Sequence, residues 1–380
     1  MFGKSINLFK VFGFQISVDL SWLIIAVLVT WSLAVGFFPH YLEGLKASDY
    51  WILAVFGALG LFFSIIFHEF WHSLVARKLG VPISGITLFV FGGVAQMDDE
   101  PTTPKSEFWI AVAGPLASLF LALVFYLLFS LFQGMDMTRG VTGVLMYLAL
   151  INFILALFNL IPAFPMDGGR ILRAILWHTR KDLRQATQTA ANMGSVFGYV
   201  LMGLGLLNLL TGNAVGGLWY FIIGIFIRFV ARSSYQQLMV KQALHGEKVA
   251  GLMNRPVYVP GDISLQELVE DYIYRYHFKM FPVQENGELS GCITTRQVGE
   301  IERENWPDIL VREAARQCST ENTVRPDEDV IKVLGRMNKT GQSRMMVVEN
   351  GELKGIISLK DIMAYLSSRM ELEGDSSFSD

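Results

Sequence analysis

The sequence His68-Glu69-Phe70-Trp71-His72, an HExxH pattern inside a long apolar stretch, constrains the chain more than any other feature. If this stretch is helical, His68 and His72 project from one face, one turn apart. Two imidazoles in this arrangement can share one Zn²⁺, and Glu69 beside them can take a proton from metal-bound water. The pattern therefore predicts a helix with a metal site on one face.

The surroundings of this motif favour a membrane site. Residues 51–76 are otherwise almost entirely apolar. Ionisable groups at membrane depth are costly to desolvate, so they indicate a function by default. In a soluble protein the same pattern would be weaker evidence, because HExxH can arise by chance near a helix end.

The composition agrees with a membrane protein. Of the 380 residues, 52% are hydrophobic and 17% are charged, and the mean hydropathy is +0.41. A net charge of −3 gives no support for nucleic-acid binding. Cys292 and Cys318 are too few for a disulfide framework and are expected to be free thiols in a reducing cytosol. No cleavable signal peptide is expected at the N-terminus.

Six apolar runs of about the length that a bilayer requires are predicted to be membrane spans. They cover residues 16–37, 51–76, 107–132, 143–162, 194–210 and 216–230. Lysine and arginine gather at alternate ends of these runs, so by the positive-inside rule both termini are cytosolic. At helical rise, His68 then lies roughly 13 Å from the cytosolic boundary at Arg77. The site is expected to be buried, nearer the inner face.

Residues 81–97, between the second and third runs, are apolar and rich in glycine and β-branched residues. The segment is too short and too interrupted for a span. Two β-favouring pieces around Gly92-Gly93 predict a hairpin that dips into the protein, where protein or a cavity must satisfy its backbone. Two roles remain open: an edge strand that pairs with an extended substrate, or a simple surface hairpin at the interface.

A catalytic zinc site needs a third protein ligand and an open position. The candidate is Asp167, which follows two prolines and precedes Gly168-Gly169, where the backbone can turn its carboxylate toward the helix bundle. The alternative is that Asp167 caps a helix starting near Gly168, with Arg170 and Arg173 on its exposed face. Nearby, Asn159 is an isolated amide that could merely bond across helices.

Together, HEFWH in one span and NLIPAFPMDGG at the end of a later one resemble the site-2 protease family of intramembrane zinc metalloproteases, peptidase family M50. The segment Ala113-Gly114-Pro115-Leu116-Ala117-Ser118 resembles a further small-residue motif of that family. The resemblance covers roughly residues 9–232.

The resemblance implies a role for each matching residue. One Zn²⁺ per chain would be bound by His68, His72 and Asp167. The general base would be Glu69, and Asn159 would help to hold the substrate carbonyl or oxyanion. The pair Gly92-Gly93 would belong to a re-entrant β loop beside the site.

The C-terminal third reads as a repeat. Two units open at Pro260 and Pro326, and each continues through a helix to a strand pair that turns at Asn-Gly, then to another helix. Equivalent glycines, Gly291 and Gly355, are 64 residues apart. The repeat resembles a tandem pair of CBS domains, a Bateman module, over about residues 252–369.

In CBS domains, a Gly-x-x-[Ser/Thr]-x-x-Asp run binds adenosine nucleotides. The second unit matches, which implies a site for ATP or another adenosine nucleotide at Ser358 and Asp361, the hydroxyl near phosphate and the carboxylate on ribose. The first unit departs, with Gln297 in place of Asp. The alternative is a dimerisation module in which Asp361 is an ordinary helix-start residue, and a homodimer is expected.

The sequence thus predicts a polytopic α-helical membrane protein of about six spans with a re-entrant β-hairpin, followed by an α+β tandem CBS module. The expected divisions are a membrane domain at 1–240, a linker at 241–250, the CBS pair at 251–370 and a disordered tail at 371–380. The expected location is a bacterial cell membrane.

The resemblance implies an intramembrane zinc endopeptidase. Its substrate would be a transmembrane regulatory protein, cut in or near the bilayer as in regulated intramembrane proteolysis. The CBS pair would act as a nucleotide-responsive regulator or dimeriser. One alternative is a CBS-gated transporter or channel, which has no need of HExxH. Another is a different HExxH protease, which would draw a ligand from a later glutamate, and no glutamate lies in the spans after Glu107.

Overall fold

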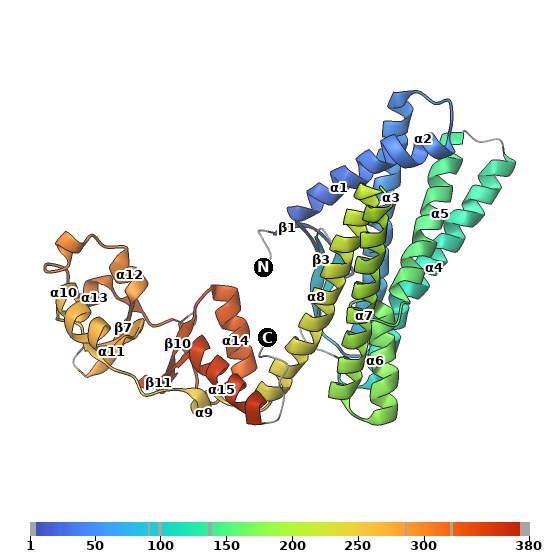
Figure 1. Cartoon of the computed structure of the whole chain (residues 1–380). Coiled ribbons are helices and arrows are strands. Elements are labelled where there is room, and N and C mark those ends of the chain that lie inside the picture. Colours follow the sequence, from blue (N-terminus) through green and yellow to red (C-terminus); the bar gives the residue numbers. More distant parts are fainter. Residues whose placement is uncertain are drawn as a thin grey trace. The chain divides into compact units, whose positions relative to one another are not determined.

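The structure, a computed structural model, describes residues 5–89, 92–97, 101–135, 139–285, 287–319 and 322–372. The chain forms two compact units, Met1–Gln236 and Gln237–Asp380 (Figure 1). The described residues contain six helices long and apolar enough to cross a membrane, which confirms the predicted number of spans. They are Ser21–Tyr41, Ala47–Lys78, Pro104–Gly134, Arg139–Asn159, Leu183–Leu210 and Gly216–Leu244.

Local sequence explains where the long helices begin and end. Helix α3 (Ala47–Lys78) ends on Arg77 and Lys78, cations that favour a helix C-terminus. Helix α4 (Pro104–Gly134) begins with a proline just inside an N-cap, Thr103, whose side chain accepts from the Ser106 backbone N–H. Helix α5 (Arg139–Asn159) ends three residues before Pro162, which cannot continue a helix.

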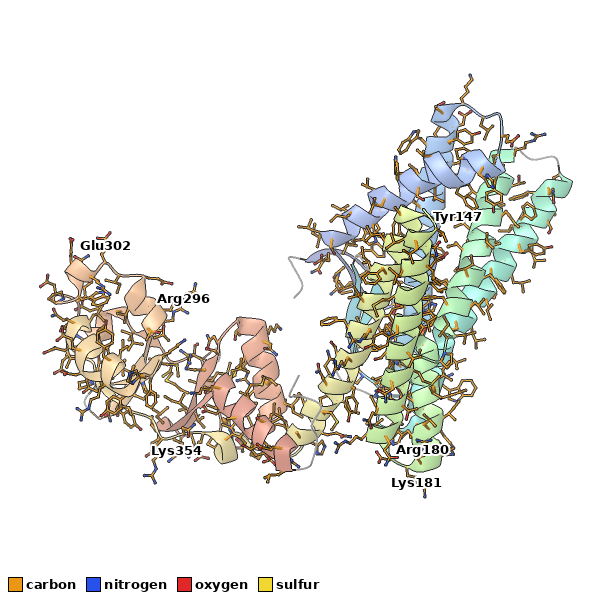
Figure 2. The ribbon with its side chains drawn as sticks, in the orientation of Figure 1. Tyr147, Arg180, Lys181, Arg296, Glu302 and Lys354 are labelled. Atoms are coloured by element: carbon orange, nitrogen blue, oxygen red, sulfur yellow. The ribbon has the colours of Figure 1, made fainter. Side chains whose placement is uncertain are left out.

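Three further helices complete the membrane unit. The short helix α6 (Asp167–Arg180) is followed by α7 (Leu183–Leu210) and α8 (Ala214–Leu244). Arg180 and Lys181 lie together at the end of α6 (Figure 2), where Lys181 adopts a left-handed conformation and its N–H donates to the Trp177 carbonyl. The first span is built from α1 (Ser21–Ser32), a π-helical turn (Leu33–Phe37) and α2 (Phe38–Tyr41).

A four-stranded sheet, in the order β1-β2-β3-β4, accompanies the helices. Its strands are β1 (Ser5–Val11), β2 (Phe14–Asp19), β3 (Ile83–Phe89) and β4 (Gly92–Met97). Strand β2 pairs antiparallel with β1 and parallel with β3, and β3 pairs antiparallel with β4. The predicted hairpin is therefore present, but Gly92 and Gly93 lie in strand β4 rather than in its turn.

The prediction that the first span begins at residue 16 is wrong. Residues 14–19 form strand β2, and the helix begins at Ser21. The apolar Ile16 and Val18 alternate with polar neighbours, a period of two that suits a strand paired on both sides.

The C-terminal unit contains the predicted repeat, with a sheet in each half. The first sheet, β5-β6-β7-β8, uses Val259–Pro260, Met280–Glu285, Glu288–Thr294 and Arg316–Gln317. The second, β11-β10-β9, uses Glu352–Ser358, Arg344–Glu349 and Thr323–Val324. The two hairpins share a register shift at equivalent places, Val283/Gln284 and Val347/Val348. The second turns at Asn350 and Gly351, both with positive φ, as the Asn-Gly signal predicts.

Helices follow the same repeated order. In the first half they are α10 (Leu265–Glu267), a π-helical turn (Leu268–Ile273), α11 (Tyr274–Tyr276), α12 (Thr295–Gly299), a 3₁₀ turn (Arg303–Asn305) and α13 (Val311–Ala314). In the second half they are α14 (Val330–Thr340) and α15 (Leu359–Leu372), preceded by the short α9 (Val249–Leu252). From residue 373 the tail predicted to be disordered lies outside the described residues.

The core of the second half includes part of the predicted linker. Ala243, Leu244 and Val249 are buried together with Ile357 and Ile362. Because Ala243 and Leu244 close helix α8, the last turn of that helix belongs to the packed interior of the C-terminal unit.

Candidate metal centre

Two helices bring three ligand atoms together. Helix α3 carries His68 and His72 on one face, and α6 begins at Asp167. The Nε2 atoms of the two histidines lie 3.1 Å apart, and Asp167 Oδ2 lies 3.1 Å from His68 Nε2 and 3.2 Å from His72 Nε2. Both imidazoles are buried, and the Asp167 side chain is 12% exposed. This is the only metal-binding group of this kind found among the described residues.

The geometry of this triangle fits a zinc ion. With zinc–ligand distances near 2.0–2.1 Å, the edges of a tetrahedral site measure about 3.3 Å. The three observed edges, 3.1–3.2 Å, are close to that value. Two imidazole nitrogens and one carboxylate oxygen also form a donor set typical of catalytic zinc, with the fourth position left open.

Helix α4 sets which nitrogen of each imidazole faces the triangle. The Nδ1–H of His72 donates to the Ile110 carbonyl at 2.6 Å, so Nε2 carries the free lone pair. His68 Nδ1 lies 2.9 Å from the Ser118 hydroxyl, which holds this ring in the same sense. Such partners orient metal-binding histidines and raise the basicity of the ligating nitrogen.

A glycine on α4 makes room for this approach. A Cβ at Gly114 would stand 2.2 Å from His72 Nε2 and 2.5 Å from His68 Nε2. Both distances are far below van der Waals contact, so no other residue fits here. The small-residue segment of the third span thus provides both the space, at Gly114, and a hydrogen-bonding partner, at Ser118.

The Asp-Gly-Gly sequence aims the carboxylate at the histidines. Asp167 is the first residue of α6, and Met166 is its N-cap. A Cβ at Gly168 would stand 2.3 Å from the Ile161 carbonyl oxygen, and one at Gly169 would stand 2.5 Å from the Ala163 carbonyl carbon. Only glycines allow the helix to start so close to the preceding loop. The structure therefore departs from the alternative in which Asp167 caps the helix and faces away.

Arg173 also departs from that alternative, because it is buried rather than exposed. Its guanidinium forms an ion pair with Glu107, whose side chain is 1% exposed, and lies 5.3 Å from the centre of the Phe164 ring. The pair joins α6 to the start of α4. Sequence reasoning missed it, although a glutamate at the start of one apolar helix and an arginine in the next polar segment were the available signal.

Glu69 lies beside the triangle. Its carboxylate interacts electrostatically with both histidines, with Asp167 and with Arg170. It is half-buried on the same helix as the histidines. The position is suitable for a group that exchanges protons next to a metal.

The structure does not bring Asn159 into the triangle. Its amide donates to the Leu155 carbonyl of its own helix at 3.0 Å. A different amide, Asn152, is 0% exposed and donates to the Ser64 hydroxyl at 2.9 Å, one helical turn before His68. Sequence reasoning missed Asn152, although a second amide in the same apolar helix was the available signal.

Strand β4 lies at an edge of the sheet and against helix α3. Gly93 pairs with Leu88 and Gly92 with Phe89, so both glycines belong to the strand ladder on one side. Among the described residues β4 is the last strand in the order, and its other side has backbone groups to which a strand can be added.

In the CBS module, Ser358 and Asp361 are engaged with each other. The Asp361 carboxylate accepts from the Ser358 backbone N–H at 2.9 Å and from its hydroxyl, and the Ser358 hydroxyl accepts from the Asp361 N–H. In the first repeat, Thr294 and Gln297 form the same capping box. The departure from Asp to Gln therefore preserves the helix cap while removing the charge.

The family relationships agree with this arrangement. The model of peptidase family M50 matches residues 56–142 and 129–204, and the CBS domain model matches 249–299 and 308–368. The "Putative zinc metalloprotease Rip3" of Mycobacterium tuberculosis is 36% identical over 361 residues, covering 94% of this chain and 92% of its own. The "Zinc metalloprotease MJ0392" of Methanocaldococcus jannaschii is 35% identical over 364 residues, 96% of each. The solved site-2 protease of M. jannaschii is 34% identical, covers 61% of this chain and 95% of its own, and gives a TM-score of 0.43.

An apolar helical unit with a His-His-Asp group, joined to a CBS pair, defines an integral membrane metalloprotease with a C-terminal CBS module. The chain belongs to peptidase family M50: it is a zinc metalloprotease of the site-2 protease type.

Proposed function

We propose that the chain is an endopeptidase that hydrolyses a peptide bond in or near a membrane-spanning segment of a regulatory membrane protein. The observation that carries the proposal is the triangle of His68, His72 and Asp167 with Glu69 beside it, in which the two histidines and Glu69 lie on the membrane helix α3. Zinc bound there supplies a Lewis acid that polarises the scissile carbonyl and makes water a nucleophile near neutral pH.

The chain's own residues divide the remaining work. Glu69 accepts the proton of the attacking water and returns it to the leaving amine, a role typically worth about 10²–10⁴-fold in rate. The Ile110 carbonyl and the Ser118 hydroxyl keep the two imidazoles oriented. Asn159, at the end of α5, is proposed to reach the oxyanion after releasing its bond to Leu155.

The free edge of β4 supports an extended mode of substrate binding. The peptide bonds of a helix are shielded by their own hydrogen bonds, so a transmembrane segment must unwind before it is cut. A strand added beside Gly92 and Gly93 would satisfy the backbone of the unwound segment. The position of β4 against α3 supports delivery of that strand to the metal-binding helix.

Glu69→Gln tests the assignment of the base. We expect loss of cleavage of a membrane-spanning reporter with zinc content kept at about one per chain, because the substitution removes the proton acceptor but no ligand. Glu43→Gln, at an exposed position outside the triangle, is the matched control. Turnover retained in Glu69→Gln would remove the general base from the proposal.

For the CBS pair, we propose that it binds an adenosine nucleotide and regulates the protease, and that two chains form a homodimer. A cleft of about 1230 Å³ lies between the two repeats. Its lining is strongly basic, with Lys279, Arg296, Arg316, Lys339, Arg344 and Lys360 against Glu300. This charge supports a phosphate-bearing ligand, with Ser358 and Asp361 at the neighbouring helix start.

Titration of the purified protein with a fluorescent ATP analogue tests nucleotide binding. We expect saturable binding that weakens about tenfold in Arg344→Ala, since an ion pair to phosphate is a strong charge-assisted contact. Lys354, labelled in Figure 2, is not among the residues that line the cleft, so Lys354→Ala is expected to leave the affinity unchanged. Equal affinities in both variants would contradict a nucleotide in this cleft.

A further inference from the structure

The turn between β1 and β2 is attached to the helix that carries the metal ligands. Phe12 and Gly13 form this turn with φ values of 49° and 90°. The Arg77 guanidinium, near the end of α3, donates to the Phe12 carbonyl at 2.6 Å and lies 4.5 Å from the centre of the Phe14 ring. One side chain thus holds both the backbone and a ring of the hairpin.

Phe70 forms a second attachment from the same helix. Its ring centre lies 5.6 Å from that of Phe12 and 5.9 Å from that of Phe14, the latter edge to face. Phe70 lies within the HExxH sequence, next to Glu69, and Arg77 lies seven residues later, on the same side of the helix. The hairpin is therefore fastened directly beside the catalytic sequence.

This attachment is transmitted through the sheet to its opposite edge. Strand β2 pairs with β3 from Gln15↔Gly85 to Val18↔Leu88, and Leu88 pairs in turn with Gly93 of β4. A Cβ at Gly85 would stand 2.6 Å from the Gln15 carbonyl oxygen, so no side chain fits between β2 and β3 at this position. A shift of the hairpin would therefore move β4 as well.

The sheet also meets α3 near its other edge, where β3 and β4 pack directly against the helix. Residues 79–82 connect the helix to β3, and the Val81 N–H donates to the Ala76 carbonyl at 2.9 Å. These contacts hold the β3–β4 side of the sheet. The contacts of Arg77 and Phe70 hold the β1–β2 side, so that the sheet is attached to α3 on both sides.

We propose that Arg77 and Phe70 are positioning residues for the substrate. They fasten the β1–β2 turn to α3 and thereby fix the β4 edge at the distance from the metal-binding face that a bound strand requires. This inference rests on the proposed role of β4 as the strand that receives the substrate.

Loss of the contacts made by Arg77 and Phe70 is expected to raise KM and to leave kcat almost unchanged. We call the contacts of Arg77 and Phe70 with the β1–β2 turn the clamp. Without the clamp only a fraction of molecules hold β4 in the productive position, and the apparent affinity for substrate is the intrinsic affinity multiplied by that fraction. Once substrate is bound the edge is again in place, so kcat is retained. For Arg77→Ala we expect KM to rise about tenfold, kcat to change less than about twofold, and zinc content to stay at that of the wild type.

Lys78→Ala is the matched control. Lys78 is the adjacent cation at the same helix end and has no hydrogen bond or ion pair among the described residues. Lys78→Ala removes one positive charge from the same helix end and leaves the clamp intact. Arg77→Lys keeps the charge but loses the planar group over the Phe14 ring, so an intermediate KM is expected.

Hydrogen–deuterium exchange of the purified full-length protein supplies a readout independent of activity. We expect faster exchange in β2 and β4 of Arg77→Ala and Phe70→Leu, and wild-type exchange in Lys78→Ala. Equal KM and equal exchange in Arg77→Ala and Lys78→Ala would overturn the clamp. A wild-type protein that binds zinc but cuts no peptide would instead overturn the proposed function, and the exchange comparison would still decide the clamp.

Discussion

At the scale of single residues, the metal triangle depends as much on neighbouring small groups as on the ligands themselves. His72 is held by a backbone carbonyl of α4, and His68 by the Ser118 hydroxyl on the same helix. Gly114 allows α4 to come close enough to provide both contacts. A sequence motif of small residues thereby acts on imidazoles some forty to fifty residues earlier.

Gly114→Ala is predicted to weaken zinc binding strongly. The added Cβ would overlap both Nε2 atoms, so the imidazoles or α4 must move. We expect zinc affinity to fall by at least about 100-fold, the upper end of what losing a supporting contact typically costs. Metal analysis of the purified variant measures this. Gly134→Ala, on the same helix with open space around it, is the control and should bind zinc normally.

The buried thiol of Cys292 is predicted to react slowly with alkylating reagents. Burial, with a contribution from nearby Cys318, raises the pKa of Cys292 from its ordinary value of 9.0 to about 11. At pH 8 only about one thiol in a thousand is then ionised. In Cys318→Ser, alkylation of Cys292 should be slow at pH 8 and accelerate roughly tenfold per pH unit toward pH 11. Rapid alkylation at pH 8 would contradict the buried position.

The raised pKa also has a stability consequence of definite sign. The folded state retains the Cys292 proton while the unfolded state releases it near pH 9, so the unfolded state binds fewer protons above that value. The free energy of unfolding of the C-terminal unit should therefore decrease as pH rises from 9 to 11. Cys292→Ala should remove the contribution of this thiol and make the decrease smaller.

At the scale of elements, the buried pair of Glu107 and Arg173 joins α4 to α6 and so supports the position of Asp167. Its partners come from segments 66 residues apart, and a helix crossing decides whether they meet. The HExxH spacing could be predicted because both histidines lie on one helix, where four residues fix their geometry. The sheet order could not, because β2 pairs with β3 across an entire membrane span.

Glu107→Gln is predicted to destabilise the membrane unit. It leaves the buried Arg173 without its counter-charge, a loss that typically costs about 3–5 kcal/mol. Thermal unfolding in detergent measures the change. Disruption of the exposed Arg296–Glu300 pair by Glu300→Gln should cost less than about 1 kcal/mol. Similar losses of stability in the two variants would contradict a larger stabilisation by the buried pair.

At the scale of the whole molecule, charge distribution predicts that both termini and the CBS pair face the cytosol. A break in the helix at Asp167 was foreseeable, because two prolines and two glycines mark the end of a span. These residues alone left open whether the carboxylate faces the histidines, and the family resemblance supplied that assignment. The role of Asn159 stays a prediction, since its amide bonds within its own helix. The space made by Gly114 was not foreseeable, because it depends on how two helices meet.

Exposed Cys318 provides a test of this orientation. A membrane-impermeant maleimide should label Cys318 in inside-out vesicles and leave it unlabelled in intact cells, since a charged reagent does not cross the bilayer. Cys318→Ser should abolish the label, because Cys292 is buried. Labelling in intact cells would reverse the predicted topology.

Metal content of the purified protein, wild type beside His68→Ala and Asp167→Ala, tests the central claim most directly. The three donor atoms 3.1–3.2 Å apart predict about one zinc per chain in the wild type. Each substitution removes one ligand, so zinc should be sharply reduced in both variants. Zinc that survives Asp167→Ala at the wild-type level would contradict the three-ligand site and the assignment of the Asp-Gly-Gly sequence to the metal.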